Sequence, residues 1–177
     1  MELTQKDNLM IMPYINCMFI LELKNKEFLK SEYYKNMDFQ DKNIPRVFSE
    51  VGLDNQGLLL MPLYSLLVVP RELYANELSN EFTGLNKKIK TIKTYEESNY
   101  SYDKNEINYV KHIRNAVSHA NLRFEPNEYV EFIDTNKYGN KNEKCIIRIP
   151  LVKICELLEY LQGIFYRYIG ALKLNLF

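Results

Sequence analysis

The apolar and polar positions along this chain follow a helical period over most of its length. Segment 105–121 has apolar residues at steps of three, three and four, which is the spacing of one buried helix face. Segment 150–173 continues that spacing over a longer stretch. The two stripes consist of Ile107, Val110, Ile113 and Val117, and of Leu151, Ile154, Leu158, Leu161, Phe165, Tyr168 and Leu172. The second half of the chain is therefore predicted to contain two amphipathic helices.

Two more helices are predicted in the first half. Residues 13–34 are compatible with a long helix, and Pro13 fits its first turn, where the missing N–H costs little. Residues 57–80 are nearly all apolar at first and amphipathic later. Pro62 and Pro70 interrupt this segment, so a kink or a break is expected there.

Two segments between these helices are less regular. Residues 36–56 read as a connector with a short helical turn at 46–51. Residues 81–104 change from lysine-rich to rich in Ser, Asn and Tyr, which fits either an exposed extra helix or a mobile loop. Their lysines and tyrosines could grip single-stranded RNA or form a solvated face. These residues are Lys87, Lys88, Lys90, Lys93, Tyr95, Tyr100 and Tyr102.

A strand period appears between the last two helices. Apolar and polar residues alternate in 122–134 and again in 145–149, and the turn-rich loop 136–142 separates them, which predicts a β-hairpin. The expected fold is mainly all-α. It is a bundle of four to five helices with a small β-hairpin before the C-terminal helix, in a single domain over residues 1–177.

Composition narrows the class of protein. The 46% hydrophobic content excludes a wholly disordered chain, and 23 basic residues balance 23 acidic ones, so no overall field attracts nucleic acid or membrane. The longest apolar run, 58–69, falls short of the ~20 residues that a bilayer requires. The N-terminus lacks the basic start of a signal peptide. We expect a soluble cytoplasmic protein without a membrane partner.

Candidate metal ligands are few. Cys17, Cys145 and Cys155 lie far apart in the sequence, which suits a reduced compartment better than a disulfide framework or a zinc site. His112 and His119 are separated by about 10 Å along a helix, too far to bind one ion. No metal or cofactor is expected.

The polar side of segment 105–121 carries the candidate chemistry. On a helix Arg114 and His119 point about 140° apart and differ by about 7.5 Å in rise, whereas Asn115 lies within about 40° of His119. Lys111, Asn115 and Ser118 fill the directions between them. The arginine and the histidine could converge on one phosphate only if the helix ends near His119 or if a second protomer contributes.

The run Arg114-Asn115-Ala116-Val117-Ser118-His119 resembles the Arg-x(4–6)-His signature of the HEPN superfamily. Members are small helical bundles, and many are metal-independent ribonucleases of toxin–antitoxin, anti-phage and CRISPR systems. The order of elements extends the resemblance to most of the chain. The resemblance implies a cytoplasmic prokaryotic homodimer whose active cleft lies between two protomers, with RNA as substrate and a cognate antitoxin as an expected partner.

The expected roles follow from residue chemistry. The pKa of histidine, near ~6.5, suits proton transfer during attack of a 2′-hydroxyl on its own phosphate, which assigns that role to His119. The guanidinium of Arg114 would stabilise the phosphate in the transition state, and Asn115 would orient His119 or contact the phosphate. Substrate contacts are predicted for Lys111, Ser118 and His112.

Other interpretations of the same residues stay open. Arg114 and His119 could serve only as dipole partners and cap donors at a helix C-terminus. His112 could be an ordinary exposed or packed helix residue. The protein could also be a catalytically inactive HEPN module that binds RNA, nucleotide or a protein partner, or an all-α interaction protein in which the pair is structural.

Overall fold

The computed structural model describes residues 4–53, 55–136 and 142–171. The chain forms two compact units, residues 1–65 and residues 66–177, and each is described by itself.

The first unit is helical. Its main helix is α1 (Gln5–Asn25), which begins at a capping box in which the side chains of Thr4 and Asp7 each accept the other's backbone N–H. The expected helix over 13–34 is therefore shifted, and Pro13 lies inside α1 rather than in its first turn. The helix ends just before Glu27, whose φ of 50° is left-handed.

Short helices complete this unit. They are a 3-10 turn (Phe28–Lys30), α2 (Glu32–Lys35), α3 (Asn43–Val51) and α4 (Gln56–Leu63). The α3 helix confirms the helical turn expected at 46–51. Asn55 caps α4 by accepting the N–H groups of Gly57 and Leu58. A π-helical segment, Tyr64–Val68, follows α4, so the interruption expected near Pro62 and Pro70 is confirmed.

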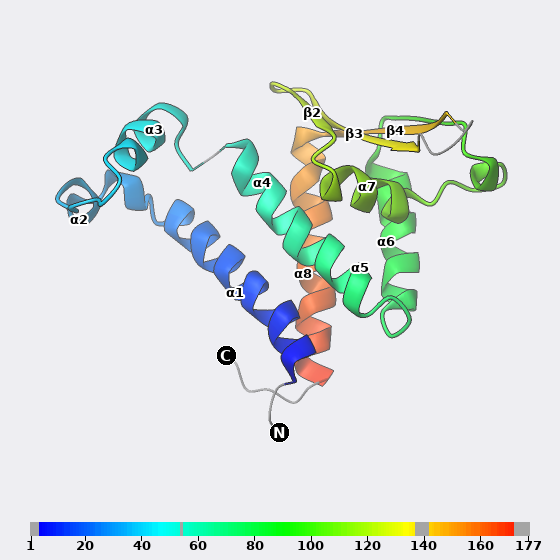
Figure 1. Cartoon of the computed structure of the whole chain (residues 1–177), viewed down its shortest axis with the longest axis horizontal. Helices are drawn as coiled ribbons and strands as arrows, with labels where there is room; N and C mark the ends of the chain where they lie inside the picture. The colour runs from blue at the N-terminus through cyan, green and yellow to red at the C-terminus, as the bar shows by residue number, and fades with distance from the viewer. Residues whose placement is uncertain (1–3, 54, 137–141, 172–177) are drawn as a thin grey trace. The chain divides into compact units, whose positions relative to one another are not determined.

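The second unit contains all the strands that the structure describes. Its helices are α5 (Val69–Leu73), α6 (Ser79–Ile92), α7 (Tyr109–Ser118) and α8 (Leu151–Ala171). Its strands are β1 (Tyr95–Ser98), β2 (Leu122–Glu125), β3 (Tyr129–Asn136) and β4 (Glu143–Pro150). They form one antiparallel sheet in the order β1-β4-β3-β2. Figure 1 shows α6, α7 and α8 on the same side of this sheet.

The core of the second unit lies between the sheet and these helices. The strand residues that face it are buried, and they are Val130, Phe132 and Asp134 on β3 and Cys145, Ile147 and Ile149 on β4. The α7 stripe of Val110, Ile113 and Val117 is buried as well. Ile107 is half-buried and precedes the helix. The period of the α7 stripe thus identified the buried face correctly.

The mainly helical prediction is confirmed, but the small hairpin is wrong because a four-stranded sheet takes its place. The β3 and β4 strands correspond to the hairpin, and the loop residues 137–141 lie outside the described residues. Strand β2 pairs with β3, and β1 pairs with β4 from the segment expected to be a helix or a loop. That segment also contributes most of α6, which is not simply exposed: Phe82, Leu85, Ile89 and Ile92 are buried.

Among the described residues, no single helix combines the length and apolar character that a span requires. A bent pair, Asn43–Val51 followed by Gln56–Leu73, meets those two criteria by length and composition alone.

Candidate active site

The predicted motif lies on the last turns of α7. The helix starts at Asn108, whose side chain accepts the N–H of Lys111 at 3.0 Å, and His119 is its C-terminal cap residue. The backbone N–H of His119 donates to the carbonyl of Asn115 at 3.0 Å. Ala120 then adopts a left-handed φ of 50°, which turns the chain toward β2. The helix end expected near His119 is confirmed.

His119 presents its ring to solvent. The residue is exposed, and its side chain makes no hydrogen bond or ion pair with the part of the chain that the structure describes. Its neighbour Ser118 is different, because the Ser118 hydroxyl donates to the Arg114 carbonyl at 2.8 Å. His119 is thus available to an external ligand, whereas the hydroxyl proton of Ser118 is used within the helix.

Arg114 is held by one carboxylate. Its side chain is 29% exposed, and its guanidinium lies 3.0 Å from Glu72 on α5, which is 57% exposed. The Arg114 Nε is buried and has no partner among the described residues. A buried N–H without an acceptor is unfavourable. A phosphate could reach only the exposed part of the guanidinium and not the buried Nε.

His112 is placed differently from the prediction. It is 1% exposed, and its two ring nitrogens face two carboxylates: Nδ1 lies 2.7 Å from Asp134 and Nε2 lies 2.8 Å from Asp103. The rings of Tyr100 and Tyr102 pack over it. The ring is enclosed and both of its polar atoms are already bonded, so this arrangement does not offer His112 for direct contact with substrate.

Asn115 belongs to the same buried network. Its amide Nδ2 donates to Asp134 at 2.9 Å, and the acceptor is the same oxygen that faces His112. Burial by itself raises the pKa of Asp134, but the hydrogen bonds from His112 and Asn115 outweigh it and leave the pKa below its ordinary value. Asn115 thus directs its amide into the protein rather than toward the solvent side where His119 lies.

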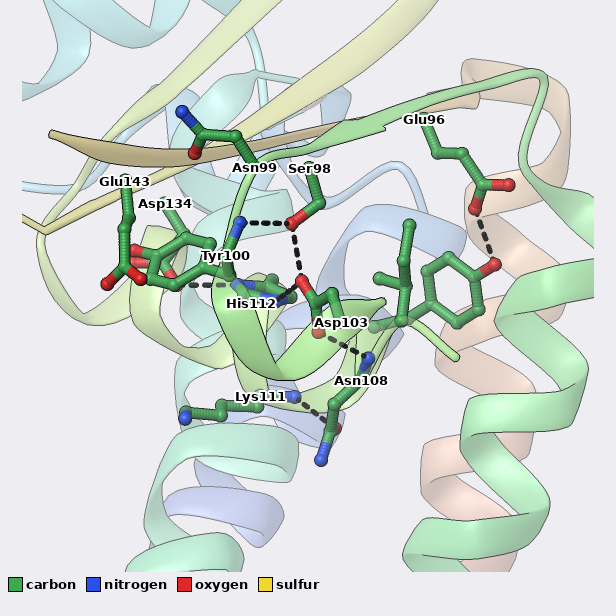
Figure 2. A network of polar contacts seen from close by, with 12 residues as sticks. Glu96, Ser98, Asn99, Tyr100, Asp103, Asn108, Lys111, His112, Asp134 and Glu143 are labelled. Carbon is green, nitrogen blue, oxygen red and sulfur yellow. Dashed lines mark hydrogen bonds and ion pairs between the residues drawn. The ribbon is translucent and has the colours of Figure 1, made fainter. Parts of the chain in front are cut away.

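The second carboxylate of the network comes from the segment before α7. Asp103 lies in a 3-10 turn, where it accepts from the Ser98 hydroxyl and receives the backbone N–H of Asn108 at 3.4 Å. Figure 2 shows these contacts around His112. Sequence reasoning missed Asp103 and Asp134, because they are distant in the sequence and neither stands in a recognisable spacing with His112.

One group of side chains in the described part of the chain could hold a metal ion. The ligand atoms of Asp103, His112 and Cys145 all lie within 4.8 Å of one another, and all three residues are buried. Hydrogen bonds already engage Asp103 and His112 in this arrangement. Burial raises the pKa of the Cys145 thiol to about 12, so the thiol keeps its proton near neutral pH. We therefore interpret the group as a hydrogen-bonded network.

The lysines near the site differ in their availability. The ammonium of Lys111 lies 3.8 Å from the centre of the Tyr102 ring, which is a cation–π contact. Lys88 pairs with Glu156 at 2.6 Å and Lys93 with Glu96 at 3.0 Å. These two pairs weaken the idea that the whole lysine-rich segment grips RNA.

A cavity of about 380 Å³ opens between α6 and the start of α7. Its lining includes Arg71, Lys87, Phe82, Asn86 and Val110. Within the described residues, neither Arg71 nor Lys87 has a carboxylate partner, and the Arg71 guanidinium lies 5.4 Å from the centre of the Phe82 ring. The cavity therefore combines two available cations with an aromatic wall, one turn of α7 away from the motif.

The mainly helical fold and the Arg-x4-His motif at a helix end are consistent with the resemblance to HEPN proteins. The family model described as HEPN pEK499 p136 matches residues 1–171. The chain belongs to this HEPN family. No curated protein and no solved structure matched the chain.

Proposed function

We propose that this protein is a metal-independent endoribonuclease that cleaves single-stranded RNA. The observation that carries the proposal is the exposed, unengaged ring of His119 at the end of the helix that also bears Arg114. Histidine is suited to proton transfer at neutral pH, and arginine is suited to an anionic transition state. Membership of a HEPN family supports the same assignment.

The proposed reaction follows from these two side chains. His119 accepts the proton of a ribose 2′-hydroxyl, whose oxygen attacks the adjacent phosphorus. The bond to the 5′-oxygen breaks, and the imidazolium or solvent returns a proton to that oxygen. The products are a 2′,3′-cyclic phosphate and a 5′-hydroxyl. Arg114 stabilises the charge that the phosphoryl oxygens carry during the exchange.

We place this chemistry between two copies of the chain. Arg114 and His119 leave α7 in directions about 140° apart, so a single helix does not focus them on one phosphate. A symmetric homodimer that pairs the arginine of one protomer with the histidine of the other removes this difficulty. Lys111 and the hydroxyl oxygen of Ser118 lie between the two directions and would contact the substrate.

Two cationic residues at the cavity suggest where the RNA backbone binds. Arg71 and Lys87 would bind the RNA backbone at the cavity beside α7.

A protein that cuts cellular RNA would act as a toxin or a phage-defence component, with an antitoxin as partner. Expression in bacteria should then arrest growth, and His119→Ala should relieve the arrest. Equal toxicity of the variant would contradict this role.

A second function has one observation in its favour. The ion pair between Arg114 and Glu72 at 3.0 Å partly neutralises the cation that catalysis requires. This contact favours a catalytically inactive HEPN module that binds RNA, nucleotide or a protein partner. Such a module would bind RNA with a salt-dependent affinity and release it uncut.

One experiment separates the two functions. Purified protein is incubated with single-stranded RNA in EDTA, in parallel with His119→Ala and Arg114→Ala. If the protein is a ribonuclease, we expect the wild type to cleave RNA and the cleavage rate of each variant to be at least about a hundredfold lower. Binding without cleavage, or equal cleavage by all three proteins, would contradict it. Lys144→Ala serves as a control, since Lys144 is exposed on β4, lies outside the cavity lining and is not one of the lysines considered for RNA binding.

A further inference from the structure

The end of α7 is attached to strand β3 at two points on either side of His119. Before it, the Asn115 amide donates to the Asp134 carboxylate at 2.9 Å. After it, the Asn121 amide donates to the Ile133 carbonyl at 2.7 Å, and the Ile133 N–H donates to the Asn121 carbonyl at 3.0 Å. His119 therefore occupies a short turn whose two ends are fixed by neighbouring residues of one strand.

The first attachment is anchored in the protein interior. Asp134 is buried, and it accepts hydrogen bonds from Asn115 and His112 and interacts with the Tyr100 hydroxyl. Several donors to one buried carboxylate give it a single favourable orientation, because turning it would leave buried donors unpaired. Asp134 is thus a rigid acceptor for Asn115.

His112 extends the anchor to a second carboxylate. Both ring nitrogens of His112 lie within hydrogen-bond distance of a carboxylate, so the ring bridges Asp134 and a second acid. Asp103 holds the Nε2 side at 2.8 Å and is itself bonded by Ser98. The ring lies between the two acids, and Figure 2 shows it enclosed between the 3-10 turn and the sheet. This arrangement connects β1, α7 and β3 in one buried network.

We propose that Asp134, supported by His112 and Asp103, is a positioning residue that sets the location of His119. It acts through Asn115, whose side chain it holds and whose carbonyl accepts the N–H of His119. The proposal rests on the proposed ribonuclease activity for its catalytic consequence, but not for its structural one. It also gives Asn115 a role different from contact with the phosphate.

The test uses Asp134→Asn with a matched control on the same strand. The control is Glu131→Gln, because Glu131 is also a buried acid of β3, but it bonds Arg148 on the opposite face of the sheet. Two quantities are measured in each variant. They are the exchange rates of the backbone amides of residues 119–121 by NMR, and the KM and kcat of RNA cleavage.

Loss of positioning has a specific signature. In Asp134→Asn the amide exchange at residues 119–121 should rise at least about tenfold, and kcat should fall about tenfold or more while KM changes less than about twofold. KM should be preserved because the groups proposed to bind RNA do not contact Asp134. Glu131→Gln should leave both quantities close to those of the wild type. If the two variants behave alike, the role of Asp134 is only structural and the proposal fails.

A second variant tests the attachment itself. Asn115→Ala removes the amide that donates to Asp134 and leaves the contact between Asp134 and His112 in place. Whether or not Asp134→Asn folds, Asn115→Ala must raise the exchange at 119–121, and an unchanged exchange rate would overturn the proposal. If the wild type does not cleave RNA, the proposed function fails, and the exchange measurements still decide the positioning role.

Discussion

Glu72 is the residue that most directly limits the chemistry of Arg114. Its carboxylate lies 3.0 Å from the guanidinium and is more than half exposed, so water screens the pair and its contribution to stability is small. In the proposed ribonuclease, the same carboxylate would compete with the RNA phosphate for the guanidinium. Glu72 is therefore expected to affect RNA binding much more than folding.

We expect Glu72→Gln to strengthen RNA binding severalfold and to increase the cleavage rate, because it frees the guanidinium and removes a repulsive charge. The free energy of unfolding should change by less than about 0.5 kcal/mol. Fluorescence anisotropy with labelled RNA and urea unfolding measure the two effects. Glu159→Gln is a suitable control, since Glu159 is exposed on α8 and the net charge changes equally. Weaker RNA binding by Glu72→Gln would show instead that Glu72 orients Arg114.

Because the pKa of Asp134 is lowered in the folded protein, the free energy of unfolding depends on pH in the acidic range. A carboxyl group whose pKa is lower in the folded state stabilises the protein above its ordinary pKa of about 3.9, and this contribution disappears as the pH falls through the folded value. Asp134→Asn should cost about 3 kcal/mol at pH 7, because it breaks a buried hydrogen-bonded pair. Below pH 4 the free energy of unfolding of Asp134→Asn should fall less steeply than that of the wild type. The two slopes should differ by up to about 1.4 kcal/mol per pH unit.

Urea unfolding between pH 7 and pH 3 measures how the free energy of unfolding changes with pH in the wild type and in Asp134→Asn. A steeper acid loss in Asp134→Asn than in the wild type would mean that Asp134 is protonated in the folded protein. Glu131→Gln again controls for the loss of a buried acid on the same strand.

The residues of the site differed in how visible they were in the sequence. Arg114 and His119 stand in one local spacing, so they could be proposed as site residues without a structure. The partners of His112 could not be identified in this way. Asp103 and Asp134 reach it through a turn and a strand on either side of α7, and only the tertiary fold brings them together.

Secondary elements with strong periodicity were predictable, and short polar ones were not. The α8 and α7 helices follow from their apolar stripes. Strand β1 does not, because Tyr95-Glu96-Glu97-Ser98 is four residues long and largely polar, and only its pairing with β4 makes it a strand. The buried residues of α6, Phe82, Leu85, Ile89 and Ile92, had the helical spacing in the sequence, but the lysines between them made the segment look exposed.

Gly84 on α6 lies against the Tyr160 side chain of α8. A Cβ at this position would lie 2.2 Å from the Tyr160 hydroxyl oxygen. We therefore expect Gly84→Ala to destabilise the protein by about 1 kcal/mol or more, despite the higher helix propensity of alanine. Thermal unfolding measures the change.

Two variants define the cause of that loss. A Cβ at Gly170 on α8 would meet nothing within 4 Å among the described residues, so Gly170→Ala should be neutral or slightly stabilising. Combining Gly84→Ala with Tyr160→Phe removes the nearest oxygen, and the next ring atom lies at 3.5 Å, an ordinary contact. The double variant should recover most of the stability. If the double variant does not recover stability, the contact with the Tyr160 hydroxyl is not the cause of the loss.

The whole-molecule prediction concerns the proposed dimer. If each active site takes Arg114 from one protomer and His119 from the other, then a dimer with one protomer of each inactive variant, Arg114→Ala and His119→Ala, contains one intact site. An equal mixture that exchanges subunits freely should therefore reach about a quarter of the wild-type activity. RNA cleavage before and after mixing measures it.

The experiment that mixes the two inactive variants needs its own controls. Light scattering must show a dimer for the wild type and for each variant at micromolar concentration. Each variant alone must stay inactive after the same treatment. A mixture that remains inactive although the subunits exchange would mean that the arginine and the histidine act within one protomer.

The strand order also determines when the site is completed during synthesis. Strand β1 precedes α7 in the chain, yet its partner β4 follows α7, with Tyr95 opposite Arg148. Pairing across such a sequence separation forms late, because a long loop must close first. A chain emerging from the ribosome thus carries Arg114 and His119 before β3 and β4 exist to hold them. If the protein is the ribonuclease proposed above, we expect a nascent chain to lack the fixed arrangement of Arg114 and His119 until β3 and β4 have been synthesised.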